Sequence, residues 1–296
     1  MKTIRIGTRG SALAIVQTEI VRCALAEIYP DIETHTRIIK TKGDVLCDVP
    51  LDTIGGKGVF VKDIEKALLA GQIDIAVHSL KDMQASLPEG LVIGAYLQRA
   101  NPRDMLFSRG NDTLAGLPSG STVGTSSMRR RCQIRSQRPD LKIVDIRGNV
   151  QTRLKKIGKG VDAVILAAAG IIRLNLAPGI ALDITSMIPS PGQGIIAIQT
   201  RADDHDTTAL VSAIDHFQTR ICGETERSFL AMLGQDCNLP AGAYATFDEH
   251  DITILGMLGS TDETRMESMS MMGSDPSVGT RLARALMERI HRERVK

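Results

Sequence analysis

The chain alternates short apolar runs with longer segments in which apolar residues recur at helical spacing. In the segment 12–29, for example, apolar residues stand where one face of a helix would place them, and Pro30 follows directly. Helical patterns also cover 61–70 and begin near 128 and 150. Runs typical of strands separate them, at 2–7, 34–40, 73–78, 91–97, 122–123, 142–146 and 163–166. This alternation predicts α/β domains with mostly parallel sheets.

Two short segments of this pattern recur further along the chain. Residues 6–8 and 123–125 differ only in their first member, and each ends a predicted strand before a predicted helix. Residues 74–77 and 162–165 both consist of an aspartate followed by three apolar residues. Two α/β domains of similar design would explain both echoes, although segments this short also match by chance.

The pattern changes after Arg220. A helix is expected at 224–233, followed by a loop, strand-like runs at 244–247 and 252–258, and a closing helix at 278–291. This part is predicted to form a third, smaller α+β domain.

Composition excludes several classes of protein. Apolar residues make up 43% of the 296, and charged or glycine residues interrupt every apolar run before it could span a membrane. The N-terminus lacks the apolar stretch of a signal peptide, so we expect a cytoplasmic protein. The five cysteines are odd in number and none has Cys-x-x-Cys spacing, which argues against a disulfide framework and a zinc site. Cys23 lies in the apolar stripe of the first helix and is expected to be buried.

Positive charge is concentrated in one part of the chain. The net charge is only +2, but residues 99–153 hold ten Arg and one Lys against four Asp and no Glu. Cationic residues also follow the predicted strands, where parallel sheets bind ligands beside helix N-termini. Arginine binds carboxylates through two parallel hydrogen bonds, so these residues are expected to converge on one cleft for a polyanionic ligand. Alternatively, each arginine pairs locally with an acid on a solvated surface.

Three further segments are candidates for chemistry. Lys81 and Asp82 follow a buried strand, and a carboxylate among cations can stabilise a positive intermediate, although a surface ion pair is the commoner case. The segment 55–58 is rich in glycine but lacks the P-loop order, so we expect a mobile loop. Cys237 stands in a polar loop with Gly and Pro neighbours, where its thiol would be accessible for covalent attachment.

Two other classes of function remain open from the residues alone. A two-domain binding protein for a polycarboxylate would need the same arginines, but it would need neither Asp82 nor Cys237. A nucleic-acid binder is disfavoured, because aromatic residues are 3% and Trp is absent, which leaves few platforms for stacking bases.

The chain resembles the porphobilinogen deaminase family over nearly its whole length. The segments that carry the resemblance are 8–14, 55–60, 74–82, 102–104, 123–130, 146–154, 168–170, 191–194 and the loop around Cys237. The resemblance implies a transferase of tetrapyrrole (heme) biosynthesis, a hydroxymethylbilane synthase, that joins four porphobilinogens head to tail with release of ammonia. It also implies two periplasmic-binding-protein-like α/β domains, 1–98 with 195–214 and 99–194, and a C-terminal domain at 218–296.

The same resemblance implies a role for each candidate residue. Cys237 would hold a dipyrromethane cofactor through a thioether, and Asp82 would be the catalytic carboxylate. Lys57 and Phe60 would belong to a lid. The residues implied to bind the carboxylates of cofactor and substrate are Arg9, Ser11, Lys81, Ser127, Arg129, Arg130, Arg147, Arg153 and Arg173. No metal, nucleic acid, membrane or obligatory protein partner is expected, and the chain is predicted to be a monomer.

Overall fold

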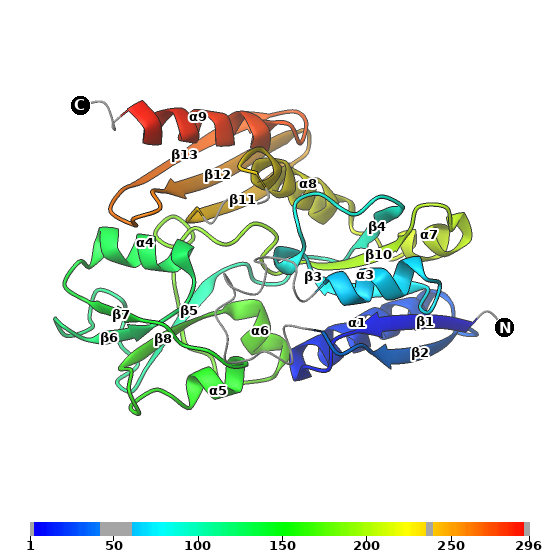
Figure 1. The fold of residues 1–296 in the computed structure, drawn as a ribbon, viewed down its shortest axis with the longest axis horizontal. Coiled ribbons are helices and arrows are strands. Elements are labelled where there is room, and N and C mark those ends of the chain that lie inside the picture. Colours follow the sequence, from blue (N-terminus) through cyan, green and yellow to red (C-terminus); the bar gives the residue numbers. More distant parts are fainter. Residues whose placement is uncertain (1–2, 42–60, 235–238, 293–296) are drawn as a thin grey trace. The chain divides into compact units, whose positions relative to one another are not determined.

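The structure, a computed structural model, describes residues 3–41, 61–234 and 239–292. The chain divides into two compact units, Met1–Ala100 with Ile195–Arg220, and Asn101–Gly194 with Ile221–Lys296. Each unit contains a five-stranded sheet with helices, and the second also contains a three-stranded sheet (Figure 1). The predicted fold class is thus confirmed. The division into three domains with the boundaries given above stays a prediction.

The sheet of the first unit has the strand order β2-β1-β3-β10-β4. The strands β1 and β2 and the strands β1 and β3 pair in parallel, whereas β10 is antiparallel to both β3 and β4. The elements of this unit are β1 (Thr3–Thr8), α1 (Ala12–Ile28), β2 (Glu33–Ile38), α3 (Lys62–Leu69), β3 (Ile75–Ser79), the 3-10 turn η2 (Leu80–Asp82), β4 (Leu91–Tyr96), β10 (Ile196–Arg201) and α7 (His205–Ser212).

The first sheet of the second unit has the order β7-β6-β8-β5-β9. Here β6 is parallel to β7 and β8, and β5 is antiparallel to β8 and β9. Its elements are β5 (Asp104–Ser108), β6 (Thr122–Gly124), α4 (Met128–Gln137), β7 (Lys142–Val144), α5 (Val150–Leu154), β8 (Ala163–Ala167), α6 (Ala168–Arg173) and β9 (Ile180–Ala181).

The two five-stranded sheets share one topology, with β1 matching β6 and β3 matching β8. The match extends to side chains: Asp74 accepts the backbone N–H of Arg5 at 2.8 Å, and Asp162 accepts that of Thr122 at 2.7 Å. These are the segments whose sequences echo one another, so the topology supports the predicted duplication. The sheets are mixed rather than mostly parallel, because β5 and β10, which the sequence did not reveal, run against their neighbours.

Helix α1 corrects one expectation about the cysteines. The helix is capped by Ser11, whose Oγ accepts the N–H of Ala14 at 3.3 Å. Its buried residues are Gln17, Thr18, Val21 and Leu25. Cys23 is exposed, because the apolar stripe of this helix is wider than the face that the sheet covers.

The C-terminal part of the second unit is an antiparallel sheet with helices. Its elements are α8 (Phe217–Met232), β11 (Ala241–Asp248), β12 (Asp251–Gly259), β13 (Met266–Gly273) and α9 (Val278–Arg292), and α8 begins in the first unit. The strands pair in the order β11-β12-β13, and the core between sheet and helices contains Phe229, Ile254, Leu282 and Leu286. Strand β13 was missed, although apolar and polar residues partly alternate along it.

Candidate functional site

The first unit brings together the predicted residues that follow β1 and β3. Because these strands are parallel neighbours, Arg9 and the Lys81–Asp82 turn leave the sheet at the same edge. Asp82 is exposed, whereas Lys81 and Arg9 are half-buried. The positive charge of Arg9 helps to lower the pKa of His78, which places the two side chains near each other. The arrangement can hold an anion beside an accessible carboxylate.

The carboxyl end of β3 is fixed by buried polar side chains. His78 Nε2 and Gln199 Oε1 lie 3.1 Å apart, and Gln199 Nε2 donates to Glu65 Oε1 at 3.0 Å. All three residues are buried. Burial lowers the pKa of His78 to about 4, so the imidazole is neutral near pH 7 and Nε2 donates to the amide oxygen. On the other face, Gln17 Nε2 donates to Ser79 Oγ at 2.8 Å.

In the second unit, α4 begins where two neighbouring strands end. Ser127 caps the helix by accepting the N–H of Arg130 at 3.5 Å. Ser126 Oγ donates to the carbonyl of Ile146 at 2.7 Å, which holds the residue before Arg147 against the start of this helix. Free N–H groups at a helix N-terminus favour anions. Ser127 thus lies at the N-terminus of α4, and its binding role stays a prediction.

Arg129 and Arg130 lie in the interior and bind one carboxylate. Asp104, with no exposed surface, accepts from Arg129 Nη2 at 2.8 Å and from Arg130 Nη2 at 2.7 Å and Nε at 3.1 Å. Arg129 also donates to the carbonyl of Ile188, and Arg130 to that of Ile165. The two guanidinium groups hold the pKa of Asp104 well below its usual range, although burial opposes them. Much of the hydrogen-bonding capacity of this pair is thus used within the protein.

Arg147 and Arg153 add positive charge that Asp104 does not balance. The pKa of Arg153 is lowered by burial and then by repulsion from Arg130 and Arg147, so Arg153 lies close enough to each of them to be repelled. Arg153 Nε donates to the carbonyl of Gly148 at 2.8 Å, which orients the guanidinium group. A cluster of like charges held in this way is stabilised when an anion binds. An anion site in this part of the second unit stays a prediction.

Arg173 also combines burial with one internal contact. Its Nη2 donates to the carbonyl of Gly194 at 2.8 Å, and burial lowers its pKa to about 10. The group keeps its charge near pH 7 and has further N–H groups for a ligand.

Two residues of the second unit were missed by sequence reasoning. Asp104 is the acid that binds Arg129 and Arg130, and Gln193 Nε2 donates to its Oδ1 at 2.9 Å. Asp104 is one of only four acids in the arginine-rich segment 99–153 and lies in the resemblance segment 102–104, and these were the available signals for it. Gln193 lies in the resemblance segment 191–194, but only the fold shows that it contacts residue 104.

Three predicted residues, Lys57, Phe60 and Cys237, lie outside the described residues.

Two other cysteines, Cys132 and Cys222, are buried. Burial raises the pKa of Cys132 to about 11, which disfavours the reactive thiolate form of this residue.

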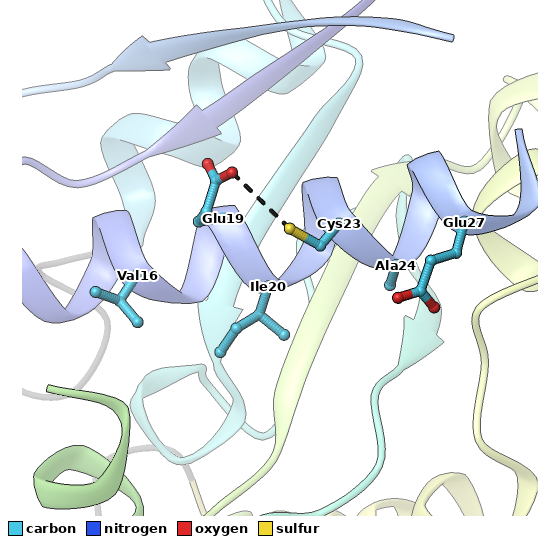
Figure 2. Close-up of a pocket in the computed structure, with 6 residues that line it drawn as sticks. All are labelled: Val16, Glu19, Ile20, Cys23, Ala24 and Glu27. Carbon is cyan, nitrogen blue, oxygen red and sulfur yellow. Dashed lines mark hydrogen bonds between the residues drawn. The ribbon is translucent and has the colours of Figure 1, made fainter. Parts of the chain in front are cut away.

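A shallow groove along α1 does not fit the predicted ligand. Figure 2 shows its lining residues, Val16, Glu19, Ile20, Cys23, Ala24 and Glu27. The two carboxylates would repel an anion.

Within the residues described, no group of three or more His, Cys, Asp or Glu side chains could hold a metal ion. None of the described helices combines the length and the apolar character that a membrane span requires.

The fold and its charged clusters define a class of protein: an α/β protein in which two five-stranded sheets share one topology and arginines follow the strand ends. Comparison with known proteins then specifies the family. Residues 4–209 match the family model described as porphobilinogen deaminase, dipyromethane cofactor binding domain, and residues 220–288 match the C-terminal domain of porphobilinogen deaminase. The chain therefore belongs to the porphobilinogen deaminase family, which confirms the resemblance and the prediction of an enzyme, a transferase.

Individual relatives align with this chain over almost their full length. The porphobilinogen deaminase of Brevibacillus brevis is 47% identical, with 96% of this chain and 93% of the relative covered. That of Roseiflexus sp. is 45% identical, with 97% and 96% covered. Among solved structures, an ancestral cationic amino acid solute binding protein has a TM-score of 0.46 at 14% identity, covering 72% of this chain and 87% of that one. The methionine binding protein has a TM-score of 0.45 at 15% identity, covering 72% and 89%.

Proposed function

We propose that this protein joins four porphobilinogens head to tail into hydroxymethylbilane, releasing one ammonia per unit, on a dipyrromethane primer held by a thioether to Cys237. The observation that carries the proposal is the guanidinium cluster of Arg130, Arg147 and Arg153 beside the N-terminus of α4. The match of residues 4–209 to a domain described as binding the dipyromethane cofactor supports it. A cytoplasmic, monomeric enzyme remains our prediction.

The residues present fit a primer that carries several carboxylates. The repulsion of Arg153 by Arg130 and Arg147 would be relieved by anionic groups, and Arg173 has N–H groups other than the one that binds Gly194. When bound, the primer supplies the pyrrole carbon to which the first substrate is joined. In the first unit Arg9, Ser11 and Lys81 would bind further carboxylates.

Asp82 would act at the reacting atoms of the substrate. The carboxyl group protonates the departing amine, the C–N bond breaks, and ammonia leaves. The carboxylate then stabilises the cation that remains on the substrate. After the new C–C bond forms, it accepts the proton lost from the pyrrole carbon. Exposure of Asp82 at the end of β3 supports this role, because substrate can reach the side chain.

Intact mass spectrometry of purified protein tests the proposal. The active protein is expected to exceed its sequence mass by two pyrrole units, and Cys237→Ala is expected to have the plain sequence mass and no turnover of porphobilinogen. The matched control is Cys23→Ala, which should retain both the added mass and activity. Added mass on Cys237→Ala would contradict the anchor, and binding of porphobilinogen without release of ammonia would favour a binding protein instead.

A further inference from the structure

The last residues of β3 are attached to the fold on both faces of the sheet. Ile75 and Val77 pack with residues of α1, and Ala76 packs with residues of α3, as alternation along a strand requires. Ser79 therefore belongs to the α1 face, where it exchanges hydrogen bonds with Gln17 at 2.8 and 3.2 Å. His78 belongs to the α3 face, where Gln199 connects it to Glu65. We call these the two polar ties.

The polar ties add little stability to the end of a strand whose other residues are apolar. Hydrogen bonds between buried side chains contribute little net stability compared with apolar groups of the same shape. A fully satisfied polar network instead restricts its members to one geometry. The strand that carries them leads directly into the turn with Lys81 and Asp82, which begins with the N–H of Leu80 bound to the carbonyl of Ile195 at 3.0 Å.

We propose that the two polar ties, Gln17–Ser79 and His78–Gln199–Glu65, are a positioning device that fixes Asp82 in its reactive place. In the proposed mechanism Asp82 alone acts at the reacting atoms, so these five residues are assigned as positioning residues. The inference rests on the proposed function, in which Asp82 acts on the substrate. A displacement of about 1 Å is enough to slow a reaction by roughly 100-fold, so rigid attachment of this turn has a direct effect on turnover.

A matched control exists in the same sheet. Thr200 of β10 and Thr208 of α7 form a hydrogen bond of 2.9 Å, which also joins a strand to a helix. Gln199 pairs with Ala76, near the start of β3, and Thr200 follows it. This control pair therefore lies toward the opposite end of β3 from Asp82. Replacing both threonines by valine removes a polar tie of the same kind without affecting the end of β3.

The experiment compares Gln17→Leu/Ser79→Ala with Thr200→Val/Thr208→Val and with Ser79→Thr, which keeps the hydroxyl. The readouts are kcat and KM for porphobilinogen on fully primer-loaded protein, the thermal midpoint, and amide hydrogen exchange at Leu80 and Met83 in the primer-free protein. We expect kcat of the first variant to fall about 10-fold or more, with KM and midpoint little changed and faster exchange at both amides. The other two variants should resemble the parent.

The inference is overturned if kcat of the Gln17/Ser79 variant stays within about twofold of the parent, if exchange is unchanged, or if the threonine control slows equally. A purely structural role would lower the midpoint without changing kcat of the loaded protein. Should the first variant not fold, His78→Leu/Gln199→Leu is judged by the same criteria. An active parent with unaffected variants contradicts this inference alone, whereas a loaded parent that consumes no porphobilinogen contradicts the proposed function and removes the inference with it.

Discussion

Arg130 binds Asp104 through both carboxylate oxygens, with Nη2 2.7 Å from Oδ1 and Nε 3.1 Å from Oδ2. Arg129 and Gln193 complete the shell around the same carboxylate. Because four donors converge on one buried acid, the local structure of β5 and α4 depends on Asp104. The pair of adjacent arginines is therefore part of the core of the second unit as well as of its predicted binding surface.

Removing this carboxylate should destabilise the protein strongly. Breaking a buried ion pair from one side leaves uncompensated charge, so Asp104→Ala is expected to lower the free energy of unfolding by about 3–5 kcal/mol. The control is Asp145→Ala, whose ion pair with Arg131 is exposed, and its cost should stay below about 1 kcal/mol. Urea unfolding measures both. Equal losses of unfolding free energy in the two variants would show that burial of the Asp104 ion pair does not determine its contribution to stability.

Arg129 and Arg147 should respond differently to leucine. Arg129→Leu removes a partner of Asp104 and is expected to destabilise the fold. Arg147→Leu leaves the partners of Asp104 in place, so it should lower the thermal midpoint less than Arg129→Leu, while turnover falls by the equivalent of about 2–5 kcal/mol. Lys142→Met, an exposed cation of β7, is the control. Normal turnover in Arg147→Leu would reject its binding role.

Stability should depend on pH through His78. The pKa of this group is about 4 in the folded protein because of burial, and about 6.5 in an unfolded chain. The folded state favours the neutral form of His78, so the contribution of this group to the free energy of unfolding is fully present above pH 6.5. That contribution is lost as the pH falls from 6.5 to 4, by about 3 kcal/mol in all. Chemical unfolding at pH 7 and 4.5 should show a smaller loss for His78→Leu than for the parent. His205→Gln, at an exposed position, should behave like the parent.

Asp82 should be required for chemistry but not for folding. Asp82→Asn, loaded from preformed tetrapyrrole, is expected to keep its primer but to turn over porphobilinogen roughly 100-fold or more slowly, since its neutral side chain cannot stabilise a cation. Asp82→Glu should retain partial activity. Because the side chain is exposed, both variants should unfold within about 0.5 kcal/mol of the parent. Product formation by a loaded Asn variant within a few-fold of the parent rate would refute the assignment.

The spacing of apolar residues along the chain was sufficient to predict the helices and strands that pack one face against a core. Helix α1 was expected at 12–29 and spans Ala12–Ile28, and the strands β1, β3 and β8 lie within a few residues of their predicted positions. Strands β5 and β10 were missed. Their apolar residues have no distinct period, and their pairing partners come from distant parts of the chain, so only the tertiary structure reveals them.

The sequence by itself determined the α/β class, the arginines at the strand ends and the family to which the chain belongs, because these depend on residue types in a fixed order. The tertiary structure decided which partner each arginine has within the protein. In sequence Arg129, Arg130 and Arg153 are equivalent cations, but the fold directs the first two onto Asp104 and the third onto the carbonyl of Gly148. It also joined His78 to Gln199 and Glu65 across three elements. Such partners lie far apart in the chain, and electrostatic interactions depend on distance and burial, which a linear sequence does not specify.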